Sequence, residues 1–185
     1  MSRLISDYIK VYSNQYTQEE LDLVINESKD FIWEPHKWAY KDTPKIDESR
    51  KSNELDMAQP TSRVAGLVNK NTRLAREKYA SEIPYGVCNE MSQPRFNRYT
   101  ENTDMRNHVD HIHVLFDGKR KGIPILSIVT VFNDDYEGGD FIFNKEDKVE
   151  LNAGDILIFP SVFLFAHKVD TVTKGVRLSA VQWAW

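Results

Sequence analysis

The residues best suited to chemistry lie in one short segment, residues 106–114, which reads RNHVDHIHV. Three of the chain's five histidines fall there, with one aspartate among them. Histidine is the side chain that most often binds metal ions in proteins. Alternate residues of an extended strand face the same side, so His108 and Asp110 form one pair and His111 and His113 form another.

The two pairs predict different metal sites. Two histidines and one carboxylate with open positions form the facial triad of non-haem Fe(II) oxygenases. His108 and Asp110 would need one more histidine, and His167 lies at the start of a late predicted strand, where strands that fold back would place it. His111 and His113 match the start of a cupin metal motif, but HIHVLFDGKRKG supplies no glutamate. For these two, rim positions or a substrate contact are the alternatives.

Composition limits the class of protein. The chain has 185 residues, 41% of them apolar and 28% charged, which is typical of one globular domain. The formal net charge of -4 does not favour nucleic acid as a partner, because phosphate binding needs a basic face. The one basic run, residues 119–121, is either a solvated loop or a contact for an acidic substrate.

The cellular compartment can be predicted from the cysteine count and from the apolar segments of the sequence. Cys88 is the single cysteine, so an internal disulfide and a multi-cysteine metal site are excluded. The first residues form no apolar stretch of signal-peptide length, and no apolar run approaches the ~18 residues of a membrane span. We therefore expect a cytoplasmic protein that does not enter a membrane, and the oligomeric state stays open.

The first half, about residues 1–90, is predicted to be helical. One helix opens with a capping box at Thr17 and Glu20 and runs through TQEELDLVINESKDFI. Its apolar stripe is Leu21, Val24, Ile25 and Phe31 or Ile32. A second helix is expected from about Arg63 to Ala80, capped by Thr61 or Ser62. Its stripe is Val64, Leu67, Val68, Leu74 and Ala75.

Residues 41–62 between these helices are polar and interrupted by prolines. A loop of this length is uncommon in a compact domain unless it is functional, so it is either a lid or a mobile surface excursion.

The second half, about residues 91–185, predicts strands. Short runs rich in Val, Ile, Phe and Tyr alternate with turn sequences such as NDDYEGG, NKED, NAGD and VTKG. Short strands at this spacing are typical of a β-sandwich or barrel. The expected class is α+β with a mainly β core, helices preceding strands.

Three segments together resemble a known family. They are RFNRYTENTDMRNHVD, VFNDDYEGGDFIF and AGDILIFPSVFLFAHKVDTVTKGVRLSAVQW. In order and spacing, over roughly residues 94–185, they resemble the Fe(II)/2-oxoglutarate-dependent dioxygenases of the prolyl-4-hydroxylase-like group. The resemblance implies a double-stranded β-helix (jelly-roll) in about 91–185, supported by helices in about 1–90, as a single domain over 1–185.

The resemblance also assigns site residues. It implies three iron ligands, His108, Asp110 and His167. It implies a 2-oxoglutarate site in which Arg177 pairs with the distal carboxylate, Ser179 hydrogen-bonds the same carboxylate, and Tyr99 contacts the co-substrate. It places Trp183 at the pocket wall.

Elementary chemistry agrees with the assignment of Arg177. Arginine presents a planar fork that matches a carboxylate. Arg177, Ser179, Val181 and Trp183 would share one face of a strand. An inward arginine in a β core is costly without an anionic partner. For Tyr99 and Trp183, plain core packing is the alternative.

Two positions depart from the family pattern. Asn102 stands where the family often has glycine, and asparagine also tolerates the left-handed conformation. Asp170 stands where the family often has proline. Gly138 and Gly139 match the family's tight turn before a strand.

The implied activity is hydroxylation of a substrate C–H bond with Fe(II), 2-oxoglutarate and O2, with ascorbate as a possible support, releasing succinate and CO2. Asp110 favours hydroxylation, because related halogenases lack this carboxylate. The substrate suggested by the resemblance is a prolyl residue in a peptide or protein. A free amino acid or other small molecule is the alternative, and a non-catalytic jelly-roll module that binds a metal or ligand is a reading from another class.

Overall fold

The computed structural model describes residues 4–38, 43–83, 88, 90–110 and 123–185. Within these residues the protein is mainly β, with two long helices and with antiparallel pairing throughout its named sheets. His111, His113 and the basic run 119–121 lie outside the described residues. Among the helices of the described part, none is both long and apolar enough to cross a membrane.

The larger sheet has seven strands in the order β1-β10-β6-β13-β4-β3-β2. Their bounds are β1 Lys10–Tyr12, β10 Ile156–Pro160, β6 Leu126–Val131, β13 Arg177–Ala184, β4 Arg95–Tyr99, β3 Asp56–Ala58 and β2 Glu34–Pro35. The central strand β13 therefore has β6 on one side and β4 on the other.

A second sheet has four strands in the order β5-β11-β8-β9, and a third pairs β12 with β7. Their bounds are β5 Met105–His108, β11 His167–Val169, β8 Phe141–Phe143, β9 Asp147–Val149, β12 Val172–Lys174 and β7 Glu137–Gly138. Two short 3-10 helices, Ile5–Tyr8 and Phe163–Phe165, complete the described elements. Buried apolar side chains of the seven-stranded and four-stranded sheets pack against each other, so the two sheets face one another.

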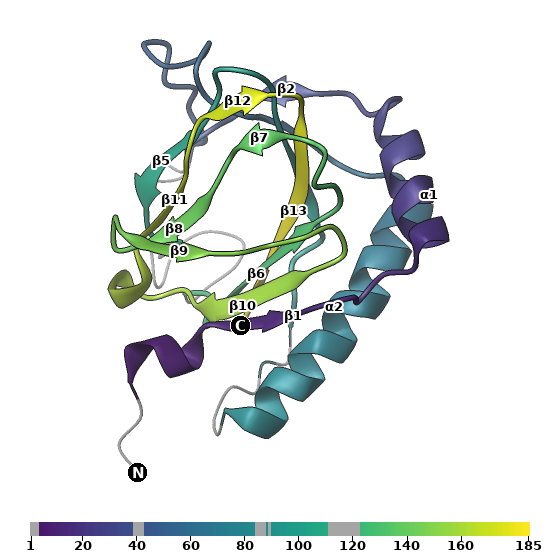
Figure 1. The fold of residues 1–185 in the computed structure, drawn as a ribbon, viewed down its shortest axis with the longest axis vertical. Coiled ribbons are helices and arrows are strands. Elements are labelled where there is room, and N and C mark those ends of the chain that lie inside the picture. The colour runs from purple at the N-terminus through teal and green to yellow at the C-terminus, as the bar shows by residue number, and fades with distance from the viewer. Residues whose placement is uncertain (1–3, 39–42, 84–87, 89, 111–122) are drawn as a thin grey trace.

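Both α-helices lie on the other side of the larger sheet, outside the ring of strands (Figure 1). α1 spans Gln18–Ser28 and has the predicted capping box, with the Glu20 amide donating to Thr17 Oγ1 at 3.2 Å and the Thr17 amide to the Glu20 carboxylate at 3.1 Å. The helix ends before the predicted residue 32. Phe31 nevertheless packs in the core, while Ile32 is 83% exposed, so Phe31 is the apolar contact.

α2 spans Ser62–Glu82 and is capped by Thr61, whose hydroxyl accepts from the Val64 amide at 3.3 Å. The prediction that Leu74 faces the core is wrong, because that side chain is 49% exposed. A helix turns about 100° per residue, so position 74 points away from the face that holds Val64, Val68 and Ala75. Tyr79 continues the buried face and donates its hydroxyl to the Tyr8 carbonyl at 3.0 Å.

The helical prediction for the first half omitted three short strands. β1, β2 and β3 all join the larger sheet, and β3 lies inside residues 41–62, where an unbroken loop was expected. Strands of two or three residues are too short to show a period. β3 pairs with both β2 and β4, and Asp56 forms an ion pair with Arg98 of β4 at 2.7 Å.

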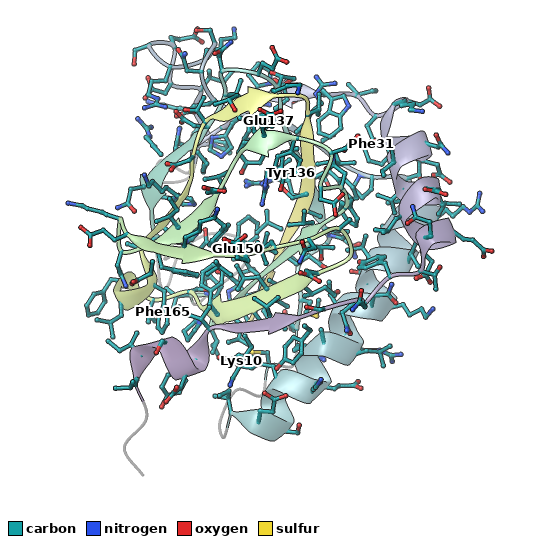
Figure 2. All side chains as sticks on the ribbon, viewed as in Figure 1. Lys10, Phe31, Tyr136, Glu137, Glu150 and Phe165 are labelled. Carbon is teal, nitrogen blue, oxygen red and sulfur yellow. The ribbon has the colours of Figure 1, made fainter. Side chains whose placement is uncertain are left out.

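Aromatic contacts join the larger sheet to the helices. Phe96 of β4 is fully buried and stacks on Phe132, with ring centroids 5.0 Å apart. Phe31, which lies beside α1 in Figure 2, packs edge-on against Phe96 at 5.2 Å. Figure 2 also shows how side chains fill the space between the ribbons.

Replacing Phe96 with alanine tests this packing. We expect Phe96→Ala to lower the free energy of unfolding by about 3–5 kcal/mol, because a buried ring is removed and a cavity is left. Leu74→Ala on the exposed side of α2 is the control and should change stability by only about 0.5 kcal/mol. Urea unfolding measures both, and equal effects of the two substitutions would contradict the assigned core.

Candidate functional site

Strand pairing brings His108, Asp110 and His167 together. His108 is the last residue of β5, His167 is the first of β11, and the two are direct partners in the antiparallel ladder. Asp110 lies two residues beyond β5. One ligand atom from each of the three side chains can be chosen so that all lie within 4.8 Å of one another. A single metal ion can therefore contact all three.

Both imidazole rings are oriented by backbone carbonyls. His108 Nδ1 lies 2.9 Å from the carbonyl of Arg106, and His167 Nδ1 lies 3.0 Å from that of Phe165. A carbonyl accepts hydrogen bonds only, so each Nδ1 carries the proton and each Nε2 keeps a free lone pair. The Nε2 atoms lie 3.6 Å (His108) and 3.9 Å (His167) from the Asp110 oxygens. Both Nε2 lone pairs therefore lie beside the Asp110 carboxylate, where one metal ion could bind all three groups.

The protonation states suit a metal site. Burial lowers the pKa of His167 to about 4, with His108 adding to that effect and Asp110 opposing it, so the imidazole is neutral near pH 7. Burial on its own raises the pKa of Asp110, but the neighbouring imidazoles of His108 and His167 and the hydrogen bond from the Ser127 hydroxyl together hold it below its usual range. A neutral imidazole and an ionised carboxylate are the forms that bind metals.

A pair of serines fixes the carboxylate. The Ser127 hydroxyl on β6 donates to Asp110 Oδ2 at 2.5 Å and lies 2.8 Å from the Ser161 hydroxyl. Hydrogen bonds of this kind orient a metal ligand from behind. His36, the one further histidine among the described residues, is buried beside Glu54 instead, with Nδ1 3.5 Å from a carboxylate oxygen.

The donor set fits Fe(II). Two imidazole nitrogens and one carboxylate, leaving further positions open, is the set typical of non-haem Fe(II) oxygenases. No cysteine belongs to the cluster, which does not favour a structural zinc site.

The pocket beside the triad is formed by alternate residues of two neighbouring strands. β4 contributes Arg95, Asn97 and Tyr99, and β13 contributes Arg177, Ser179, Val181 and Trp183. The ladder pairs Arg177 with Tyr99, Ser179 with Asn97 and Val181 with Arg95. The prediction that alternate residues of the last strand share one face is confirmed.

Arg177 is prepared for an anion. It is 1% exposed, donates from Nη1 to Ser179 Oγ at 2.9 Å, and lies over the Tyr99 ring at 5.1 Å. Its Nε finds no hydrogen-bond partner among the described residues, and no carboxylate there forms an ion pair with it. A buried guanidinium without an anion is costly, so a carboxylate ligand fits this position.

Glycine at position 139 leaves room for Arg177. Gly138 and Gly139 have φ angles of +77° and +66°, as the predicted tight turn requires. A Cβ on Gly139 would come within 3.0 Å of Arg177 Cδ, and one on Gly138 within 2.4 Å of the Thr171 carbonyl. Larger residues here would displace the arginine or the backbone.

The two departures from the family pattern have local explanations. Asn102 has a φ of +67°, so the turn survives without glycine, as predicted. The amide of Asp170 donates to the Asp140 carbonyl at 2.9 Å, a bond that proline could not form.

Sequence reasoning missed several residues around the site. Arg95 and Asn97 lie on the face of Tyr99, and a period of two applied to RFNRY would have found them. Ser127 and Ser161 come from separate strands and turns, and no local pattern marks them. Trp38, whose ring centroid lies 5.7 Å from that of His108, was missed for the same reason, because it comes from the N-terminal half of the chain.

Comparison with known proteins places this site in a family. Residues 94–185 match the family described as the 2OG-Fe(II) oxygenase superfamily. A PKHD-type hydroxylase of Aliarcobacter butzleri is 37% identical over 97 residues, which cover 49% of this chain and 42% of that protein. A PKHD-type hydroxylase of Acinetobacter baumannii is 35% identical over 110 residues, covering 56% and 46% respectively. The matched part thus spans less than half the length of these relatives.

Solved structures extend the likeness to the whole fold. A prolyl hydroxylase of Trichoplax adhaerens, in complex with a hypoxia inducible factor peptide fragment, has a TM-score of 0.73 at 12% identity, covering 97% of this chain and 84% of that one. The viral collagen prolyl hydroxylase of Paramecium Bursaria Chlorella virus-1 has a TM-score of 0.65 at 17% identity, with 96% and 94% covered. Through residues 94–185 the chain belongs to the 2OG-Fe(II) oxygenase superfamily, and its fold is that of the prolyl-4-hydroxylase-like group.

Proposed function

We propose that the protein is an Fe(II)- and 2-oxoglutarate-dependent dioxygenase that hydroxylates a C–H bond of its substrate. The observation that carries the proposal is one pocket that contains both the His108–Asp110–His167 cluster and the buried Arg177, which has no carboxylate partner among the described residues. Members of the superfamily use Fe(II), 2-oxoglutarate and O2. Fe(II) with these two co-substrates supplies the oxidising power for the C–H bond.

In this proposal His108 and His167 bind the metal through Nε2, and Asp110 binds it through a carboxylate oxygen. The carbonyls of Arg106 and Phe165 hold the two rings in the binding tautomer. Ser127 keeps the Asp110 carboxylate in place, so that the ligands are positioned before the metal arrives.

The co-substrate site is assigned to the strand residues. Arg177 binds the distal carboxylate of 2-oxoglutarate through its planar fork. Ser179 already accepts a hydrogen bond from Arg177 and is close enough to share that carboxylate. Tyr99, whose ring packs on the Arg177 guanidinium, contacts the co-substrate along its length, and Trp183 closes the pocket wall.

We also propose that the facing sheets form a double-stranded β-helix (jelly-roll) within a single domain, with α1 and α2 as its support. Within the segment 41–62, residues 43–53 would act as a lid over the metal side, because β3 is paired in the larger sheet and Thr61 caps α2. Two ion pairs support this placement, from Arg50 to Asp104 at 2.6 Å and from Asp47 to Arg106 at 2.8 Å, because Arg106 lies two residues before His108.

The proposed substrate is a prolyl residue of a peptide or protein. Support comes from the similar fold of prolyl hydroxylases, one of which is complexed with a peptide fragment. Hydroxylation of a free amino acid or other small molecule by the same groups is the second candidate. A binding module without activity would keep the pocket but produce no succinate.

Removing one ligand tests the metal site. We expect His167→Ala to abolish Fe(II)-dependent succinate production from 2-oxoglutarate, because two ligands no longer hold the metal in place. Lys168→Ala is the matched control, since Lys168 is the next residue of β11 and pairs with Asp170 at 2.7 Å. Full turnover in His167→Ala would remove the triad from the mechanism.

Removing the fork of Arg177 tests the co-substrate site. In the Mn(II)-loaded protein, Arg177→Met should weaken 2-oxoglutarate roughly tenfold to hundredfold, since a hydrogen bond to a charged group is worth about 1.5–3 kcal/mol. Binding of 2-oxovalerate, which lacks the distal carboxylate, should not change. Calorimetry measures both ligands, and equal losses for the two would show that Arg177 does not face the distal carboxylate.

The substrate class can be tested by succinate release. We expect prolyl peptides to stimulate Fe(II)-dependent succinate formation above the level without substrate, while matched peptides with alanine in place of proline should not. Stimulation by free amino acids alone would favour the small-molecule candidate instead.

A further inference from the structure

The pocket contains a second arginine that the proposed function does not use. Arg95 lies at the start of β4 and faces the same pocket as Arg177. Its Nε is buried without a hydrogen-bond partner, and within the described ranges no carboxylate forms an ion pair with it. The contact that remains is stacking on the Trp183 ring at 5.1 Å.

A second arginine of β4, Arg98, has a carboxylate partner and provides a comparison. Arg98 points to the opposite face of β4, where it stacks on Trp33 at 4.5 Å. Its Nε, like that of Arg95, has no hydrogen-bond partner among the described residues, but its Nη2 donates to Asp56 at 2.7 Å, so its charge is paired. Arg95 has the stacking partner but not the carboxylate.

The two pocket arginines lie at different ends of the pocket. Arg177 is opposite Tyr99 in the ladder, whereas Arg95 is opposite Val181. Tyr99 and Arg95 are four residues apart, roughly 13 Å along a strand. Arg95 lies over the Trp183 ring, Trp183 is opposite Ser127 in the ladder, and Ser127 donates to Asp110, so this arginine lies toward the metal end of the pocket.

The charges of the pocket are not balanced by the residues that the structure describes. Asp110 is the single carboxylate among the lining residues, and in the proposed function it is a metal ligand. A divalent metal and two arginines against one carboxylate leave an excess of three positive charges. 2-Oxoglutarate, with two negative charges, leaves one positive charge over, and buried charges are stable only when they are paired.

We propose that Arg95 is a second carboxylate-binding residue of the pocket, at the metal end, opposite the site of Arg177. The inference rests on the proposed function. The carboxylate has two possible sources. One is the metal-proximal carboxylate of 2-oxoglutarate, which is already counted in that charge balance, and the other is a carboxylate of the substrate, which would also neutralise the remaining positive charge. In both cases the guanidinium, which lies over the Trp183 ring, would donate N–H groups to the anion.

Binding to the Mn(II)-loaded full chain tests the proposal without turnover. Calorimetry would compare 2-oxoglutarate and 2-oxovalerate binding in wild type, Arg95→Met and Arg177→Met. Tryptophan fluorescence would then follow acetate, against neutral acetamide, added to the Mn(II)–2-oxoglutarate complex. Arg98→Met is the matched control. Arg98 is another arginine of β4 that lies over a tryptophan ring, but it faces away from the pocket.

Two results support the proposal and name the source. If Arg95 binds the co-substrate, Arg95→Met weakens both keto acids at least about tenfold, because both share the metal-proximal carboxylate. If it binds a substrate carboxylate, Arg95→Met leaves both keto acids unchanged and abolishes the response to acetate, while acetamide gives no response in either protein. Arg98→Met should match wild type throughout.

One result overturns it. If Arg95→Met binds both keto acids and acetate as wild type does, and only its melting temperature falls, then Arg95 serves to stack on Trp183. Should Arg95→Met fail to fold, Arg95→Gln gives the same comparison with a polar side chain. Failure of the proposed function looks different, because wild type would then not bind 2-oxoglutarate with Mn(II) and Arg177→Met would have no effect.

Discussion

The central strand β13 must satisfy two opposite environments, and the rest of the structure depends on this constraint. Leu178 and Ala180 face the helices and pack in the apolar core behind the sheet. Arg177 and Ser179, one residue away in each case, face the pocket. Because the period of a strand is two, a shift of register by one residue would place the arginine in the apolar core. Pairing with both β4 and β6 excludes that shift.

The metal site depends on a second pairing, that of β5 with β11. The register sets His108 opposite His167, and each ring is fixed by the carbonyl two residues before it. Asp110 lies beyond the strand, where its position is set instead by Ser127 of the other sheet. The three ligands thus require both sheets, which explains why the helices matter to the chemistry. They hold the larger sheet in shape from behind.

Several side chains that line the pocket bury a polar atom without a hydrogen-bond partner among the described residues. They are Arg95, Asn97, Arg177 and Trp183, and the atom in each is a nitrogen or an oxygen. Such groups reduce the stability of the free protein. A ligand that pairs with them gains binding free energy, and it stabilises the fold by an amount that grows with the logarithm of the ligand concentration once that exceeds Kd. The unpaired N–H groups of Arg95, Arg177 and Trp183 can donate to an anion, whereas Asn97 Oδ1 can only accept a hydrogen bond.

The sequence by itself determined the two helices and their caps, the β-rich second half, the turn at Gly138–Gly139 and the face shared by Arg177 and Ser179. Each of these depends on neighbours within a few residues. The sequence could suggest His167 as the third ligand but could not show that it lies beside His108. It also did not predict β1, β2 and β3, because these strands are too short to show a period. Only the tertiary structure decided which residues meet across strands: His108 with His167, Ser127 with Asp110, and Arg95 with Trp183. The reason is physical, since these contacts join residues far apart in the chain and are set by strand register and sheet packing.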